Sequence, residues 1–102
     1  MSMKDATEIS DKVRQTVYTR DSYDDTPCCI LCGKPYPEVH HFIERSRGGM
    51  GVEQNLVCLC NSCHRKLHTS KLKEYSQFCR DYLKAHYEDW NEEDLIYRKD
   101  RA

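Results

Sequence analysis

The chain has 102 residues, of which 38% are hydrophobic and 32% charged, so it is polar and long enough for one small domain. It contains no long apolar run, which excludes a transmembrane helix, and its polar start leads us to expect no secretion signal. The net charge of −1 hides a segregation, because residues 28–73 carry +4, residues 1–27 carry −2 and residues 74–102 carry −3. A basic middle segment between acidic flanks favours contact with nucleic acid at the middle of the chain.

The first part of the chain, residues 1–27, is predicted to be a helix followed by a linker. Three apolar residues recur at every fourth position, as on the buried face of an amphipathic helix: Ile9, Val13 and Val17. This spacing predicts a helix over residues 7–20 that packs on the core, with Ser10 or Thr7 as its cap. The remainder is polar and ends at Pro27, which is typical of a linker.

The middle part, residues 28–69, is predicted to be a zinc-bound core of two strands and a helix. Residues 38–43 have strand character, and a second short strand is expected over residues 55–59. Residues 45–51 contain three glycines and are predicted to form the loop between the strands. A helix over residues 61–68 follows, with an asparagine or a serine available as its cap.

The last part, residues 70–102, is predicted to be a helix and an acidic tail. Apolar and aromatic residues follow helical spacing: Leu72, Tyr75, Phe78, Cys79, Tyr82, Leu83, His86 and Trp90. They predict a helix over residues 70–90 that closes the core. Residues 91–102 are highly charged, so we expect them to fray, with at most a short turn at residues 94–97. The whole chain is expected to form a single domain.

Four cysteines have the spacing of a structural zinc site. Seven cysteines are an odd number and cannot all pair, which argues against a disulfide framework. Two Cys-x-x-Cys pairs match tetrahedral zinc ligation: Cys29, Cys32, Cys60 and Cys63. Gly33 would let the chain fold back so that both thiolates of the first pair face one ion. Cys58 and Cys79 lie in apolar patterns and are expected to be buried, and Cys28 breaks the spacing and is left out of the site.

The histidines suggest a second metal site. His64 and His68 are separated by four residues and would share one face of a helix. His40 or His41 could supply a third ligand from the first strand, and three neutral imidazoles would leave positions open for water and phosphate. Adjacent residues of a regular strand point to opposite faces. Both strand histidines could therefore serve one site only at a strand end or a bulge.

The order of these motifs resembles the HNH endonuclease family, in particular its four-cysteine, phage-type members. The resemblance covers about residues 28–68 and rests on both Cys-x-x-Cys pairs, the segment 39–43, the loop 45–49, Asn55 and the histidines of the predicted helix. It implies a small zinc-stabilised α+β domain with a ββα-metal, treble-clef-like core. Helices would flank this core on its N- and C-terminal sides.

The resemblance also implies roles for individual residues in a nuclease site. His41 would be the general base, since the unperturbed pKa of histidine, about 6.5, lies near working pH. His40 and His64 would bind the catalytic metal, with His68 as a further ligand position. Asn55 would tie the hairpin loop and orient His41. The metal would hold the scissile phosphate and stabilise the leaving oxygen, which gives 3′-hydroxyl and 5′-phosphate ends.

Further expectations concern cofactors and partners. Zinc would be structural, and Mg²⁺, Mn²⁺, Ni²⁺ or Zn²⁺ could be catalytic. Many relatives have aspartate where this chain has His40, and an imidazole at that position favours a transition metal over Mg²⁺. The substrate would be DNA, cut by nicking, with Arg45, Arg47 and Lys66 as candidate phosphate contacts. The resemblance points to a phage or prophage protein in the bacterial cytoplasm, with terminase or portal proteins as possible partners.

A non-catalytic reading is open as well. The same four cysteines could build a treble-clef zinc module that binds nucleic acid or protein. Such a module would need no joint task for the set that distinguishes the two readings: His40, His41, Asn55 and His64. The sequence leaves undecided the DNA preference, the oligomeric state, the role of the acidic C-terminal region and that of Cys28.

Overall fold

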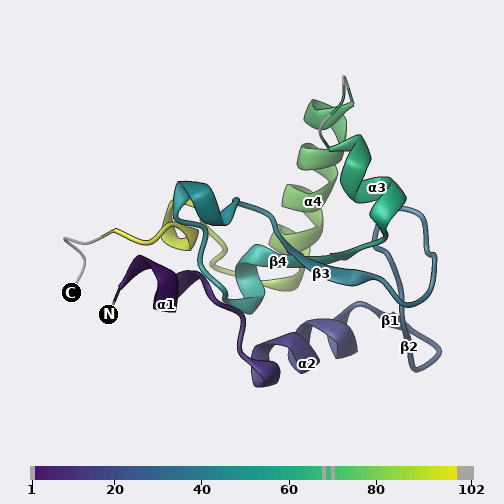
Figure 1. Ribbon diagram of the computed structural model, residues 1–102. Coiled ribbons are helices and arrows are strands. Elements are labelled where there is room, and N and C mark those ends of the chain that lie inside the picture. The colour runs from purple at the N-terminus through teal and green to yellow at the C-terminus, as the bar shows by residue number, and fades with distance from the viewer. Residues whose placement is uncertain (1, 68, 70, 99–102) are drawn as a thin grey trace.

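A short antiparallel hairpin lies at the centre of the molecule, between helices on both of its faces (Figure 1). The computed structural model describes residues 2–67, 69 and 71–98. The strands are β3 (Glu38–His41) and β4 (Leu56–Leu59), and the helices around them are α2 (Asp11–Arg20), α3 (Asn61–Lys66) and α4 (Leu72–His86). This small α+β arrangement with a four-cysteine cluster agrees with the predicted zinc-stabilised ββα fold.

Shorter elements complete the fold. They are helix α1 (Met3–Thr7), strands β1 (Ser22–Tyr23) and β2 (Thr26–Pro27), and the 3₁₀ turns Arg45–Arg47, Glu53–Asn55 and Glu92–Leu95. The strands β1 and β2 pair as a minimal hairpin inside the predicted linker. No helix among the described residues is long and apolar enough to cross a membrane.

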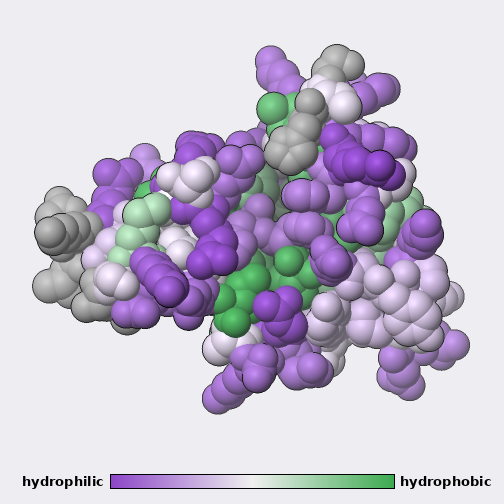
Figure 2. All heavy atoms as spheres, viewed as in Figure 1, coloured by the Kyte–Doolittle hydropathy of each residue, from purple (hydrophilic) through white to green (hydrophobic). Residues whose placement is uncertain are grey.

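The register of the central hairpin distributes its side chains over two cores. Val39 pairs with Cys58, and both pack with Val17 of α2 on one face. Val57 and Leu59 of β4 point to the other face and pack against α4. Both faces are thus buried, which explains why β4 reads as a continuous apolar run. Figure 2 shows a largely hydrophilic outer surface, with hydrophobic residues gathered in the centre of the view above α2.

An ion pair at the end of α2 fastens three elements together. The Arg20 guanidinium donates to Asp21 at 2.7 and 2.9 Å and also to the hydroxyl of Tyr87 at 3.1 Å. Asp21, which is 6% exposed, accepts from the backbone N–H of Cys58 at 3.0 Å and from the hydroxyl of Tyr82. Burial acts to lower the pKa of Arg20, but Asp21 raises it well above its usual value. The pair therefore stays charged while it joins α2 to β4 and α4.

The predicted N-terminal helix is wrong at its start. The chain forms two helices, because Glu8 adopts an extended conformation after α1 and Ser10 then caps α2, which begins at Asp11. The Ser10 hydroxyl accepts from the N–H of Val13 at 3.1 Å, so the serine alternative for the cap is confirmed. α1 contains only two apolar residues, Met3, which is 42% exposed, and Ala6, so hydrophobic periodicity carries no signal for it.

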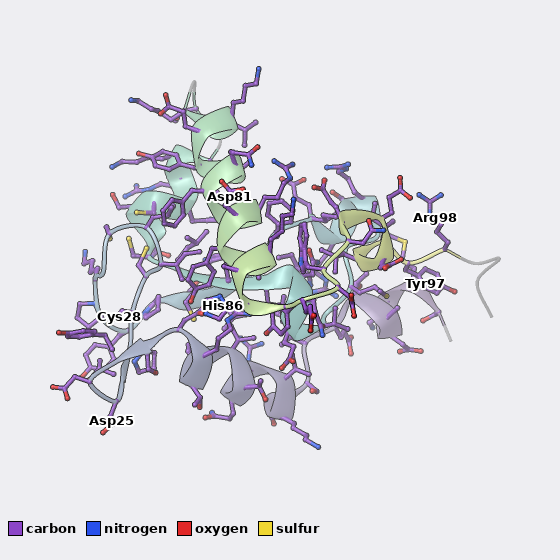
Figure 3. All side chains as sticks on the ribbon, turned by 180° about the vertical axis from the view of Figure 1, so that it is seen from behind. Asp25, Cys28, Asp81, His86, Tyr97 and Arg98 are labelled. Carbon is purple, nitrogen blue, oxygen red and sulfur yellow. The ribbon has the colours of Figure 1, made fainter. Side chains whose placement is uncertain are left out.

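The C-terminal segment up to Arg98 is docked, so the expected fraying is wrong for this part. Leu95 is 3% exposed, and its carbonyl accepts from the N–H of Met50 at 2.8 Å. Tyr97 donates its N–H to Gly48 at 2.7 Å. Figure 1 and Figure 3 both show this segment beside α1, and Figure 3 labels Tyr97 on it. Two backbone hydrogen bonds and one buried leucine offset the charge of the segment.

The long helix is shorter than predicted. α4 ends at His86, and Tyr87 adopts an extended conformation. Trp90 therefore lies beyond the helix, where its indole N–H donates to the carbonyl of Gln54 at 2.7 Å and its ring packs on the core. Leu72 and Phe78, which belong to the predicted apolar stripe, are 50% and 47% exposed.

Candidate active site

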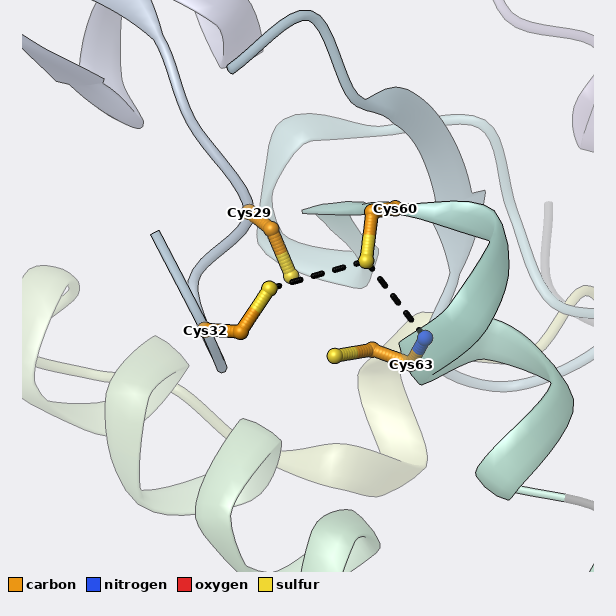
Figure 4. Close-up of side chains that lie close together, drawn as sticks. All are labelled: Cys29, Cys32, Cys60 and Cys63. Atoms are coloured by element: carbon orange, nitrogen blue, oxygen red, sulfur yellow. Dashed lines mark hydrogen bonds between the residues drawn. The ribbon is translucent and has the colours of Figure 1, made fainter. Parts of the chain in front are cut away.

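The four predicted zinc ligands converge. Their sulfur atoms all lie within 4.8 Å of one another, and Figure 4 shows them pointing to a common centre: Cys29, Cys32, Cys60 and Cys63. Gly33 adopts φ +80 and donates its N–H to the carbonyl of Cys29 at 2.9 Å, which closes the first knuckle. Burial acts to raise the pKa of Cys60, but hydrogen bonds from the Cys63 N–H and neighbouring thiols lower it to about 7. Four sulfur ligands with an accessible thiolate fit tetrahedral zinc.

The other three cysteines lie outside this cluster. Cys58 and Cys79 are buried, and burial raises the pKa of each to about 12, so both are neutral thiols in the core. Their expected burial is confirmed. Cys28 donates its thiol to the carbonyl of Thr26 at 3.2 Å, and Figure 3 shows it near the β1–β2 hairpin.

Two histidines from different elements lie in contact. The rings of His40 on β3 and His64 on α3 stack with centroids 3.8 Å apart and planes 14° apart. The Nε2 atom of His40 is buried without a hydrogen-bond partner in the described part of the chain, 3.9 Å from a carboxylate oxygen of Glu38. Burial lowers the pKa of His40 to about 4, and His64 adds to this effect while Glu38 opposes it. A neutral imidazole with an unsatisfied ring nitrogen is suited to bind a divalent metal.

His41 lies on the face of β3 opposite to that of His40. The register is regular, with His40 opposite Val57 and His41 opposite Leu56, so no bulge brings the two rings together. His41 is the last residue of the strand. Its Nε2 lies 2.8 Å from the carbonyl oxygen of Thr7, at the end of α1.

The partner of His41 determines its tautomer. A carbonyl oxygen can only accept, so Nε2 carries the proton and Nδ1 of the neutral ring holds a lone pair. Burial lowers the pKa of His41; the bond to Thr7 acts in the opposite direction, and nearby Arg45 and Arg14 lower the pKa further. The net shift is downward, which favours a neutral imidazole whose Nδ1 can accept a proton.

The structure therefore brings together part of the predicted histidine set. His40 and His64 meet on one face, His41 lies on the other, and His68 is outside the described residues. Within the described part of the chain, the four cysteines are the group of three or more potential ligands that comes close enough to hold one ion.

Asn55 ties the glycine-rich loop. Its side chain is fully buried and accepts from the N–H of Ile43 at 2.8 Å, while its amide donates to the carbonyls of Ile43 at 3.2 Å and Met50 at 2.9 Å. Its own carbonyl accepts from the N–H of Phe42 at 2.7 Å. Asn55 thus holds the backbone that follows His41, whereas the His41 ring itself is held by α1.

The predicted phosphate contacts are exposed. Arg45 and Arg47 lie on the 3₁₀ turn after β3, and Lys66 ends α3. Arg45 is close enough to His41 to affect its pKa, and so is Arg14 of α2, which sequence reasoning did not single out. The Thr7 carbonyl was missed as well, because a backbone oxygen leaves no signal in residue identity.

A change at Gly51 should disturb the support of His41. The Gly51 N–H donates to the carbonyl of Ala6 at 3.0 Å, and a Cβ at Gly51 would lie 2.0 Å from the carbonyl oxygen of Glu8. We expect Gly51→Ala to displace α1, with an overpacking cost of about 1–3 kcal/mol. Thermal unfolding would measure this cost, and ¹⁵N NMR of the imidazole would show loss of the fixed His41 tautomer. Ser46→Ala, in the same loop, is the control, and an unchanged His41 spectrum in Gly51→Ala would contradict the expectation.

Comparison with known proteins agrees with this geometry. Residues 29–70 match the HNH endonuclease family. The chain is 56% identical over 47 residues to the Escherichia coli protein named type IV methyl-directed restriction enzyme EcoKMcrA. The matched segment covers 46% of this chain and 17% of that enzyme. It is also 36% identical over 64 residues to a Nostoc protein named anaredoxin. That match covers 61% of this chain and 79% of the relative. The chain therefore contains a domain of the HNH endonuclease family, at residues 29–70.

Proposed function

We propose that this chain is a metal-dependent endonuclease that hydrolyses phosphodiester bonds in DNA. The observation that carries the proposal is the His40–His64 pair, in which a buried ring nitrogen has no hydrogen-bond partner among the described residues. In a chain of the HNH family, such a pair is suited to hold a catalytic cation. The four-cysteine cluster is closed by its own ligands, so we assign it to structural zinc.

His40 and His64 would hold the divalent cation, with His68 as a further candidate outside the described residues. When bound there, the cation would supply charge stabilisation for the phosphate and for the departing 3′ oxygen. Two neutral nitrogen ligands favour Mn²⁺, Ni²⁺ or Zn²⁺ over Mg²⁺. Glu38 lies 3.9 Å from the His40 nitrogen and offers an oxygen ligand that the sequence did not suggest.

His41 would take the proton from the attacking water. The Thr7 carbonyl leaves Nδ1 as the basic atom, and the downward pKa shift keeps the ring neutral. β3 pairs with β4 alone among the described strands, so its other edge has no neighbouring strand. A phosphodiester that crosses this edge at the strand end would face His40 from one side and His41 from the other. Arg14 and Arg45 beside His41 would attract the phosphate.

Finer assignments belong to the same proposal. One site of this kind cuts one strand, so nicking is the expected reaction, with 3′-hydroxyl and 5′-phosphate ends. Arg47 and Lys66 stay predicted phosphate contacts. A phage or prophage origin, a cytoplasmic location and terminase or portal partners rest on resemblance alone and stay predictions.

A specific observation favours the alternative of a non-catalytic zinc module. His40 and His41 lie on opposite faces of a regular strand, so the protein alone does not gather them at one point. A treble-clef module that binds nucleic acid or protein would use the cysteine cluster and leave the histidines without a common task. Activity measurements separate the two readings.

A plasmid-nicking assay tests the proposal. Protein that holds one zinc per chain, at the cysteine cluster, should leave supercoiled DNA intact without further metal, and added Mn²⁺, Ni²⁺, Zn²⁺ or Mg²⁺ should yield relaxed circles before linear DNA. His64→Ala should lose cutting, whereas His86→Ala, an exposed histidine on α4, should retain it. Methylated and unmethylated plasmid should be compared, since the Escherichia coli relative is named for methyl-directed restriction. DNA binding without cutting under every metal would establish the binding module instead.

A further inference from the structure

Tyr36 is held in an unusual backbone conformation with its ring in solvent. Its φ is +58, in the left-handed region that bulky residues rarely adopt, and the residue is 83% exposed. Prolines stand on both sides of it, and its N–H donates to the carbonyl of Pro27 at 3.1 Å. Backbone strain of this kind costs about 1–3 kcal/mol and persists where the surroundings impose it. The fold therefore holds the backbone of an aromatic residue in place without burying its ring.

Tyr36 lines a groove between residues 34–38 and α3. One wall runs from Lys34 through Tyr36 to Glu38, and the other is formed by Cys60, Asn61, Ser62 and Arg65. Its volume is about 370 Å³, within the range of roughly 300–1,000 Å³ that small-molecule sites occupy. Lys34 and Arg65 are both exposed, and Glu38 is the acidic residue in this lining, so two of the three charged side chains that line the groove are basic.

One lining residue of the groove, Glu38, also lies next to the candidate metal pair. The carboxylate of Glu38 lies 3.9 Å from Nε2 of His40, and Arg65 follows His64 on α3. A DNA strand bound at His40 and His64 would thus have its neighbouring nucleotide at the groove. Aromatic rings stack on unpaired bases of any sequence, and basic side chains at the rim contact phosphates.

We propose that this groove is a nucleotide subsite, in which Tyr36 stacks on an unpaired base next to the scissile phosphate and Lys34 and Arg65 contact the adjoining phosphates. The subsite rests on the proposed function for its position next to a cleavage point, but its binding chemistry is independent of cutting. It assigns to the chain a preference for single-stranded or locally opened DNA, because a base inside a duplex is already stacked on its neighbours.

Binding of a short labelled oligothymidine, measured by fluorescence anisotropy without added divalent metal, tests the subsite. Tyr36→Asn removes the ring and keeps a residue that tolerates positive φ. We expect it to weaken single-strand binding by about 5- to 100-fold, whereas Tyr36→Phe should bind like the unaltered chain. Tyr23→Ala is the matched control, since Tyr23 is 79% exposed and lies outside the groove lining. Zinc content and circular dichroism verify that each variant is folded.

Two further measurements decide between base stacking and a general surface effect. When the same oligonucleotide is annealed to its complement, the Tyr36→Asn variant and the unaltered chain should bind this duplex with equal affinity. Lys34→Ala and Arg65→Ala should each reduce the salt dependence of single-strand binding by about 0.7 in the logarithmic slope. Unchanged single-strand affinity in Tyr36→Asn would overturn the proposal, as would equal losses in Tyr23→Ala or on the duplex. If no variant or metal gives cutting but the Tyr36 effect is present, the subsite stands and the nuclease proposal fails.

Discussion

Replacing Cys63 by alanine is expected to unfold the domain at ordinary temperatures. Cys63 supplies one of four sulfur atoms that lie within 4.8 Å of one another, and three ligands hold zinc far more weakly than four. Structural zinc contributes an apparent 10–16 kcal/mol, about as much as the whole stability of a small domain, roughly 5–15 kcal/mol. Each strand of the central hairpin is only four residues long. We therefore expect the bound zinc to be needed to hold the Cys29–Cys32 segment against the start of α3.

Cys79→Ala provides the matched control for the zinc site. Cys79 is 2% exposed and Cys63 is 4% exposed, but only the latter belongs to the cluster. The control should lose about 0.5–3 kcal/mol through the small cavity and keep its zinc. Metal analysis together with thermal unfolding followed by circular dichroism would separate the two. A Cys63→Ala protein that retains one zinc per chain and melts like the unaltered chain would remove zinc from the account of the fold.

The parts of the fold that the sequence predicted well depend on local spacing. Two Cys-x-x-Cys pairs identify their own cluster, and the apolar stripe of α4 follows from helical periodicity. The missed parts depend on contacts between distant segments. α1 has almost no apolar residues and is held through the Gly51 N–H, and the charged segment around Leu95 is held by backbone bonds to the glycine-rich loop. Backbone contacts of this kind have no counterpart in residue identity.

The candidate site was predicted in part for the same reason. Residue types and order indicated His40, His64 and Asn55, and the structure puts the first two in contact and the third at the base of the loop. Strand alternation already made it difficult to place His40 and His41 together, and the regular register sends them to opposite faces. The carbonyl of Thr7, which is far from His41 in sequence, could only be found in three dimensions.

Replacing His41 by alanine is expected to reduce DNA nicking by about 10²–10⁴-fold, the usual contribution of a general base. The ring is half-buried at the end of β3, with Nε2 engaged by Thr7 and Nδ1 left as the proton acceptor. The substitution removes one hydrogen bond to α1, while the bond between Gly51 and Ala6 remains. The zinc content should be unchanged, and the unfolding temperature should fall only slightly. Initial rates of plasmid relaxation under saturating Mn²⁺ would measure the effect.

The comparison of three histidine variants gives this prediction its force. His64→Ala should stop cutting through loss of the metal, and added Mn²⁺ should restore little of it. His41→Ala should bind Mn²⁺ like the unaltered chain, because its ring lies on the face of β3 away from the His40–His64 pair. His86→Ala should cut DNA and bind Mn²⁺ like the unaltered chain. If His41→Ala cuts as fast as the unaltered chain while His64→Ala is inactive, the metal pair works with a base other than His41, and the Thr7 contact serves only to hold α1 against the strand.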